Sequence, residues 1–173
     1  MSDYWKEMKT GGKTVAPPVT KILVPTNEAL IRKARTAASW VWGIAGISAM
    51  NMALAQSNAP VRFPFGLGFT DFLYTVAHSM GVNPTYAALA INVLVLGCFV
   101  GLGFPIKKHR IWAFILSIVL MVLDTGVLFW ITRLTMDLPL IALFLHGVAI
   151  YSISLGMNAS KLYNQRKKSG DAI

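Results

Sequence analysis

The chain has 173 residues, of which 55% are hydrophobic and only 13% are charged. A soluble domain carries about 25% charged residues, so this composition excludes an ordinary soluble domain and predicts a membrane protein. The net charge of +9 does not indicate nucleic-acid binding, because the basic residues fall at the ends of apolar runs, as membrane topology requires. The single cysteine, Cys98, excludes an intrachain disulfide, a Cys-x-x-Cys redox pair and a cysteine-based zinc site.

Residues 1–36 are predicted to form a basic cytoplasmic arm that ends with the start of the first membrane helix. The first apolar run follows at about residues 37–55. The polar region before it is too long for an ordinary signal peptide, so we expect an uncleaved membrane span. The span carries small residues at every fourth position, which predicts close helix packing. These residues are Ala45, Ala49 and Ala53.

The connection after the first span contains a short amphipathic segment at about residues 70–80. Its apolar residues recur at i, i+3, i+4 and i+7 spacing, which predicts a helix. About ten residues cannot cross a bilayer, so we expect this helix to lie in the outer interface. Its other side carries Asp71, Thr75 and His78. This polar face is either solvated or turned inward as a lid over the polar residues of the spans.

Three more apolar runs complete a predicted four-helix membrane domain, residues 37–157. They cover about residues 85–104, 111–132 and 138–157, and about 20 apolar residues suffice to cross a bilayer. The first of these runs carries Gly97-x-x-x-Gly101, a spacing that lets two helix backbones approach closely. The motif predicts packing either within the bundle or against another subunit.

The lysines and arginines lie almost entirely on one side of the predicted membrane. The N-terminal arm holds seven, the turn after the second span holds three, and the tail, residues 158–173, holds four. The two other connections hold one each. Positive residues mark the cytoplasmic side. We therefore expect an all-α, up-down bundle with both termini in the cytoplasm, located in a bacterial cytoplasmic (inner) membrane.

Polar residues interrupt all four spans. Asp124 on the third span and His146 on the fourth each lie about 12 Å from the outer end of their span, at 1.5 Å per residue. The short turn between these spans makes them antiparallel neighbours. A carboxylate–imidazole hydrogen bond lowers the cost of burying either group, so we predict that the two side chains pair. Four more residues are expected to join this polar layer: Asn92, Asn51, Ser48 and Ser117.

The predicted pair is compatible with three roles. It can be structural glue between helices, a proton or cation relay, or part of a ligand or cofactor site. Haem is disfavoured because the three histidines, His78, His109 and His146, are offset in depth. The sequence has no His-x-x-x-His or Glu-x-x-His spacing, so no metal site is expected, and no other cofactor is predicted.

The sequence contains no nucleophile–base motif, phosphate-binding glycine loop or pair of catalytic carboxylates. It therefore favours a non-enzymatic integral membrane protein, a packing or assembly subunit of a homo-oligomer or of a larger membrane complex. The alternative is a small channel or proton-coupled transporter that uses Asp124 and His146. A membrane enzyme or cofactor carrier ranks third. The expected partners are the lipid bilayer and either further copies of the chain or another membrane protein.

Overall fold

The computed structural model describes the parts of the chain that carry its helices. These are residues 25–57, 59, 63, 66–79, 85–135 and 140–170, with only the backbone described at residues 71, 74, 75, 77–79, 85, 87, 88 and 131–135. The helices are α2 (Asn27–Gln56), α3 (Gly68–Ser79), α4 (Thr85–Lys107), α5 (Ile111–Thr135) and α6 (Leu140–Ser169).

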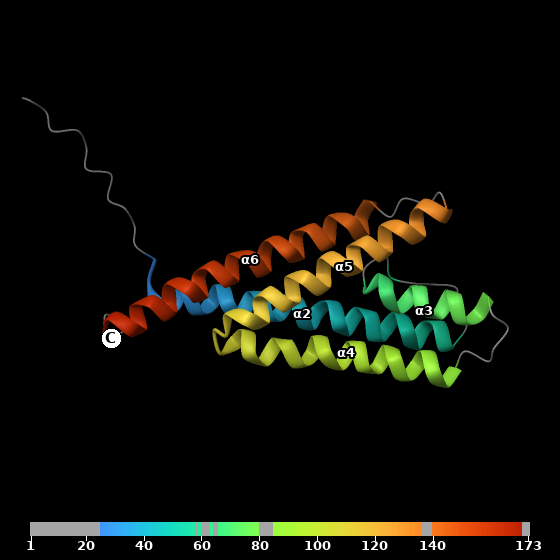
Figure 1. The fold of residues 1–173 in the computed structure, drawn as a ribbon, viewed down its shortest axis with the longest axis horizontal. Coiled ribbons are helices and arrows are strands. Elements are labelled where there is room, and N and C mark those ends of the chain that lie inside the picture. Colours follow the sequence, from blue (N-terminus) through green and yellow to red (C-terminus); the bar gives the residue numbers. More distant parts are fainter. Residues whose placement is uncertain are drawn as a thin grey trace, which may run out of the picture.

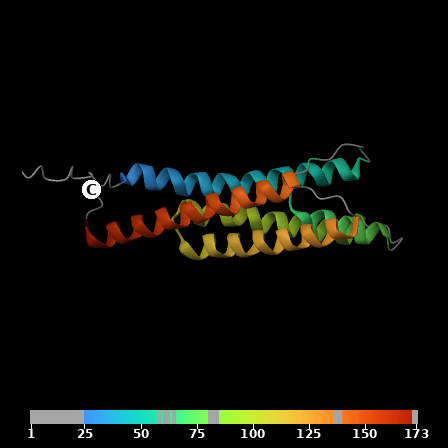
Figure 2. The same ribbon diagram turned by 90° about the horizontal axis from the view of Figure 1, so that it is seen from above.

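Four of the described helices, α2, α4, α5 and α6, are long and apolar enough to cross a membrane. The predicted all-α class with four membrane-length helices is therefore confirmed. Figures 1 and 2 show the start of α2 and the end of α6 at the same end of the bundle, which we call the proximal end. The opposite end, where α2 finishes, is the distal end.

The helix α2 packs against both α6 and α4. It begins after Thr26, whose side-chain oxygen accepts a hydrogen bond from the Ala29 backbone N–H at 3.2 Å, and Glu28 lies in its first turn. Both residues suit the positive N-terminal end of a helix. The buried apolar residues recur every three or four positions and are mostly small, so neighbouring helices approach closely. They include Ala34, Ala37, Ala38, Val41, Ile44 and Ala45.

Two glycines outside the predicted motifs allow the close approach of α4 and α6 to α2. A Cβ atom on Gly103 of α4 would overlap the Trp42 indole, and one on Gly156 of α6 would lie 2.6 Å from the Ala37 Cβ. Trp42 Nε1 also donates a hydrogen bond to the Val100 carbonyl oxygen at 3.0 Å. Both glycines therefore set the distance between α2 and its neighbours.

The two predicted packing motifs lie largely on the surface of the bundle. Ala45 is buried, but Ala49 and Ala53 are exposed. Gly97 and Gly101 are also exposed, and no atom of the described residues lies within 4 Å of their would-be Cβ positions. The described residues therefore contradict the interpretation that this glycine pair packs within the bundle, because α4 turns a different face toward α2. Packing of this pair against another subunit stays a prediction.

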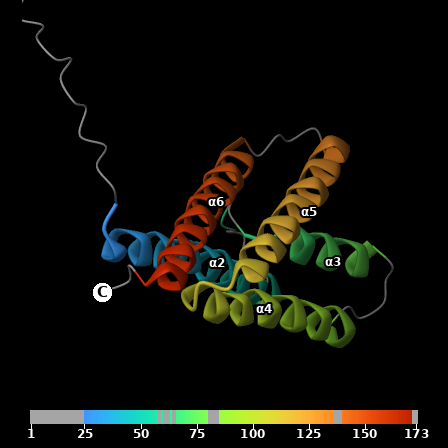
Figure 3. The ribbon, with the colours of Figure 1, turned by 60° about the vertical axis from the view of Figure 1, so that its left-hand side comes forward.

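The short helix predicted at about residues 70–80 is present as α3. Its expected location in the outer interface stays a prediction. In Figures 1 and 2, α3 runs along the long axis of the bundle. Figure 3 shows it between α4 and α5, and it contacts both helices. The reason is that α5 holds the first residues of α3 inside the bundle, as the next section describes.

The chain turns back into the bundle between α2 and α3. The backbone N–H of Leu67 donates a hydrogen bond to Ser48 Oγ at 2.6 Å, although Ser48 lies about two turns before the end of α2. Leu67 is only 1% exposed and belongs to the main hydrophobic core. We call Phe63 and residues 66–70 the re-entrant segment. This segment therefore makes contacts inside the bundle and does not lie only on its surface.

The outward sides of α4, α5 and α6 are rich in large apolar side chains. Soluble proteins rarely expose a contiguous apolar surface of this kind, whereas lipid tails suit it. The most exposed of the large apolar residues that the structure describes are Tyr86, Leu94, Trp130, Leu140 and Phe144. This surface and the four long apolar helices indicate a membrane location.

Candidate functional site

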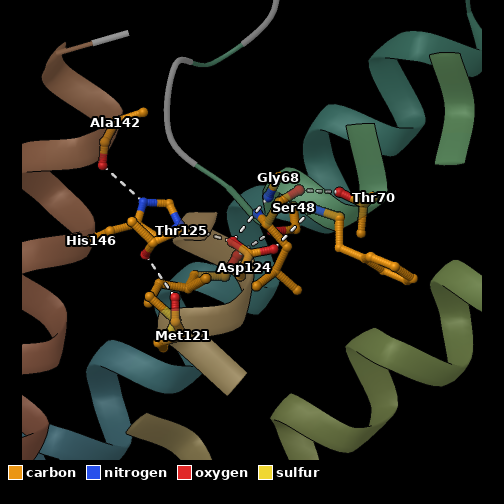
Figure 4. A network of polar contacts seen from close by, with 11 residues as sticks. Ser48, Gly68, Thr70, Met121, Asp124, Thr125, Ala142 and His146 are labelled. Atoms are coloured by element: carbon orange, nitrogen blue, oxygen red, sulfur yellow. Dashed lines mark hydrogen bonds and ion pairs between the residues drawn. The ribbon is translucent and has the colours of Figure 1, made fainter. Parts of the chain in front are cut away.

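The Asp124 carboxylate, on α5, is the centre of the buried polar contacts (Figure 4). Its Oδ2 atom accepts hydrogen bonds from the Gly68 backbone N–H at 3.0 Å and from His146 Nε2 at 2.9 Å. Its Oδ1 atom accepts one from the Phe69 backbone N–H at 2.9 Å. The carboxylate is buried, with Asp124 5% exposed. Three hydrogen bonds from two other helices, α3 and α6, therefore meet on one side chain of α5.

Two of these bonds place Asp124 at the N-terminus of α3. Gly68 and Phe69 are the first residues of that helix. Their N–H groups have no partner within an α-helix, and the helix end carries a partial positive charge. A carboxylate from α5 supplies both the acceptors and the opposite charge. Asp124 therefore caps α3 from a neighbouring helix.

The position of α3 against α5 also requires a glycine. A Cβ atom on Gly68 would lie 2.9 Å from the Leu128 Cβ and 3.2 Å from its Cα, on the turn of α5 that follows Asp124. Real Cβ atoms do not approach this closely, so any other side chain would push α3 away from α5. Gly68 thus brings its own N–H within reach of the carboxylate.

His146, on α6, is fully buried and has an acceptor on each side. Its Nδ1 atom lies 2.8 Å from the Ala142 carbonyl oxygen, and its Nε2 atom lies 2.9 Å from Asp124 Oδ2. A carbonyl oxygen only accepts, so Nδ1 carries a hydrogen and donates it to Ala142. One more proton then completes the bond between Nε2 and Oδ2, and the pair as a whole is neutral. The hydrogen bond expected between Asp124 and His146 is thus present.

Ser48 and Asn51, both on α2, hold the re-entrant segment in place. Ser48 Oγ accepts from Leu67 and donates to the Ile44 carbonyl oxygen at 2.8 Å. Asn51 makes two bonds to the backbone of Phe63: its Nδ2 donates to the carbonyl oxygen at 2.9 Å, and its Oδ1 accepts from the N–H at 2.8 Å. Each side chain therefore supplies hydrogen-bond partners for backbone groups of the segment between α2 and α3.

The four further residues expected in the polar layer, Asn92, Asn51, Ser48 and Ser117, are all buried, but two of them bond to another part of the chain. Asn51 and Ser48 bond to the backbone of the re-entrant segment, and Asn51 does not complete a network with the Asp124–His146 pair. Asn92 and Ser117 are buried, and Asn92 Oδ1 and Ser117 Oγ have no hydrogen-bond partner among the described residues. Backbone N–H groups of Gly68 and Phe69, and not the Asn51 side chain, bond to the Asp124 carboxylate.

A small apolar cavity of about 290 Å³ adjoins Asp124 between α3, α4 and α5. Its other lining residues are all apolar: Phe69, Val95, Phe99, Leu120, Leu123 and Val127. The cavity gives the carboxylate an apolar neighbourhood, in which its three hydrogen bonds are strong. It offers no second polar group for the recognition of a ligand.

The predicted outer polar face lies on α3. The backbones of Asp71, Thr75 and His78 belong to this helix, whereas their side chains fall outside the described part of the structure. Whether this face is solvated or turned inward stays a prediction. Within the described residues, no group of three or more His, Cys, Asp or Glu residues is placed to hold a metal ion.

The sequence did not reveal that backbone amides bind the carboxylate. The available signal was Gly66-Leu-Gly68. A Cβ atom on Gly66 would lie 3.1 Å from Asn51 Nδ2 and 3.2 Å from Ser48 Oγ. Both glycines thus occur where the backbone lies against a polar side chain or a neighbouring helix.

Comparison with protein-family models, curated proteins and solved structures gives no match to this chain. The interpretation of its function therefore rests on its own residues and contacts.

Proposed function

We propose that the chain is a non-enzymatic integral membrane protein that serves as a packing or assembly subunit of a homo-oligomer or a larger membrane complex. The observation that carries this proposal is the use of Asp124. Both of its carboxylate oxygens bond to the chain itself, two bonds going to the N-terminus of α3 and one to His146. The buried Asp124 carboxylate thus joins three helices, α3, α5 and α6.

The outward face of α4 supports an assembly role. At Gly97 and Gly101 the backbone of α4 is not covered by side chains, since no described atom lies within 4 Å of their would-be Cβ positions. An apolar groove of about 510 Å³ lies beside Gly101 between α4 and α5, with Cys98 and Trp112 in its lining. In a membrane, bare helix backbone favours close packing of a second helix. We propose that a helix of another subunit packs there.

The test is the mass of the purified complex in a mild detergent. Gly97→Leu and Gly101→Leu are expected to shift it to a smaller mass without loss of helix content. Gly126→Leu on α5 and Gly147→Leu on α6 are matched controls, because these glycines are also exposed with no described atom within 4 Å. Wild-type protein that runs as a single chain without partners, or equal effects of all four variants, would contradict the proposal.

The proposed topology places both termini in the cytoplasm of a bacterium. Its support is that the start of α2 and the end of α6 share the proximal end, where the basic turn after α4 also lies. The test uses single cysteines in a Cys98→Ser background. Ser169→Cys should resist a membrane-impermeant maleimide in intact cells, and Ser57→Cys at the distal end of α2 should react. The reverse labelling would overturn the topology.

A small channel or proton-coupled transporter is the second candidate function. One proton lies between Asp124 and His146, and the 290 Å³ cavity reaches the carboxylate. Asn92 Oδ1 and Ser117 Oγ, which have no hydrogen-bond partner in the described part of the chain, are further polar atoms inside the bundle. This function predicts proton flux in proteoliposomes that Asp124→Asn abolishes. Absence of flux in the wild-type protein would remove it.

A further inference from the structure

The turn between α4 and α5, at the proximal end, is held in a specific conformation. His109 has a positive φ of 56°, which is uncommon for a residue other than glycine. Its ring stacks on Tyr163 with centroids 4.4 Å apart, and its Nδ1 lies 3.0 Å from Ser160 Oγ. Its carbonyl oxygen accepts a hydrogen bond from Asn164 Nδ2 at 3.0 Å. All three partners belong to α6, so the turn is fastened to that helix.

The fastened turn and the last turns of α6 line an open cavity of about 770 Å³. Its lining is strongly basic, because it includes five cationic residues from the two segments. These are Lys108, Arg110, Lys161, Lys167 and Lys168. Within the described part of the chain, none of the five forms an ion pair with a carboxylate. Five like charges around one hollow repel each other unless an anion lies among them.

Membrane topology alone does not account for this arrangement. Lysines and arginines that mark the cytoplasmic side need only lie near the ends of the spans. They need no cavity and no turn with a residue in the left-handed region. Here two segments about 50 positions apart are fixed together by His109, and the result is a convergent set of cations. Convergence of cations on a hollow is typical of anion binding.

His109 fixes the α4–α5 turn against α6 and adds no positive charge to the cavity. Burial, and then the nearby charge of Arg35, lower the pKa of His109 below its ordinary value of 6.5. The ring is therefore neutral at pH 7, where it can share a hydrogen bond with Ser160 and stack on Tyr163. The five lysines and arginines remain as the positive groups of the cavity.

The position of the cavity relative to the membrane span of α5 indicates which kind of anion it binds. Ile111 lines the cavity and is also the first residue of α5, a helix apolar enough to cross a membrane. Trp112 follows and is exposed, as expected for an aromatic residue at a membrane interface. The cations thus lie just beyond the start of an apolar span. This is the level at which the phosphate groups of lipids lie.

We propose that this cavity binds a phosphate-bearing anion, the headgroup of an anionic phospholipid, between the α4–α5 turn and the end of α6. The phosphate would contact the cations of both segments, and the lipid tails would follow the exposed apolar side of α5. Because these charges are partly exposed, binding should weaken as the salt concentration rises.

The experiment measures lipid binding by native mass spectrometry of the delipidated full-length protein. Phosphatidylglycerol, phosphatidylcholine and inorganic phosphate are titrated separately, and phosphate is also added in competition. We compare Arg110→Gln/Lys161→Gln with a control that removes the same charges outside the cavity, Arg32→Gln/Lys33→Gln. Far-UV circular dichroism and thermal unfolding verify that both variants fold.

The wild-type and control proteins are expected to bind phosphatidylglycerol at least about tenfold more tightly than phosphatidylcholine, and the cavity variant to lose this preference. Equal binding of the two lipids, or equal losses in the cavity variant and the control, would overturn the proposal. Displacement of the lipid by millimolar inorganic phosphate would assign the cavity to a soluble phosphate compound and overturn the lipid assignment. A cavity variant that does not fold is replaced by Lys168→Gln alone, judged by the same criteria.

Discussion

Asp124 Oδ2 lies 3.0 Å from the backbone nitrogen of Gly68, although the two residues are 56 positions apart in the chain. This contact joins α5 to the first residue of α3 and explains why a short helix runs beside the spans. Backbone N–H groups inside a membrane protein need partners, because lipid offers none. The carboxylate accepts hydrogen bonds from two backbone N–H groups of the re-entrant segment, so each partner lowers the free energy cost of burying the other. Each would be costly to bury alone.

Gly68→Ala tests the close contact of α3 with α5. The new methyl group would meet Leu128, so α3 must move and its bonds to Asp124 lengthen. We expect a loss of about 1–3 kcal/mol in the free energy of unfolding, measured in a mixed detergent of increasing denaturing strength. Gly126→Ala, which meets no described atom, should be neutral or more stable by up to about 1 kcal/mol. Equal effects of the two changes would contradict the contact.

The Asp124–His146 hydrogen bond is tested by a double-mutant cycle. Asp124→Asn, His146→Ala and the double variant are compared by their free energies of unfolding. Hydrogen bonds between membrane helices average about 0.6 kcal/mol and reach about 1.7 kcal/mol, so we expect a coupling energy in that range. His146→Gln should recover part of the loss, because its amide can still donate. A coupling energy of zero would mean that the pair contributes nothing to stability.

Gly103→Ala and Gly156→Ala should weaken the packing of α2 against α4 and α6. Each added methyl group would meet a side chain of α2, Trp42 or Ala37, and overpacking of this kind costs about 1–3 kcal/mol. Thermal unfolding in detergent measures the loss. Gly43→Ala on α2 and Gly147→Ala on α6 are controls, because no described atom lies within 4 Å of their would-be Cβ positions, and they should leave the unfolding midpoint unchanged or raise it. Equal losses in these controls would contradict the close packing at Gly103 and Gly156.

The His109 turn should respond to pH in one direction. The pKa of the ring is lowered in the folded protein, so the unfolded chain takes up a proton first as the pH falls. The stability that the neutral ring contributes is therefore present above about pH 6.5 and is lost below it. His109→Asn removes the titration and tolerates a positive φ. The thermal midpoint should fall more steeply between about pH 7 and about pH 5 in the wild type than in this variant. Parallel slopes would contradict the assignment.

The spans and the Asp124–His146 pair could be predicted because they follow from regular geometry. A rise of 1.5 Å per residue and a short turn fix the relative depth of two residues on neighbouring helices. The partner of Asp124 on α3 could not be predicted in this way. Its donors are backbone amides, which every residue carries, so no side chain marks them.

The packing glycines show a second limit of the sequence. The spacing of Gly97 and Gly101 places both on one face of α4, but spacing does not say which neighbour that face meets. The structure turns Gly103 toward Trp42 and leaves the predicted pair outside. The side that faces the bundle depends on all the contacts of α4 together. A motif of two glycines reflects only a few of these contacts.

Hydrogen–deuterium exchange at the start of α3 tests most directly whether Asp124 organises the fold. The wild type and Asp124→Asn are compared in lipid nanodiscs, with the amides of α2 as an internal reference. Asparagine keeps one acceptor and loses the charge, so we expect exchange at Gly68 and Phe69 to be faster by about tenfold or more, with α2 unchanged. Unchanged protection of these two amides in Asp124→Asn would mean that the carboxylate does not hold the start of α3.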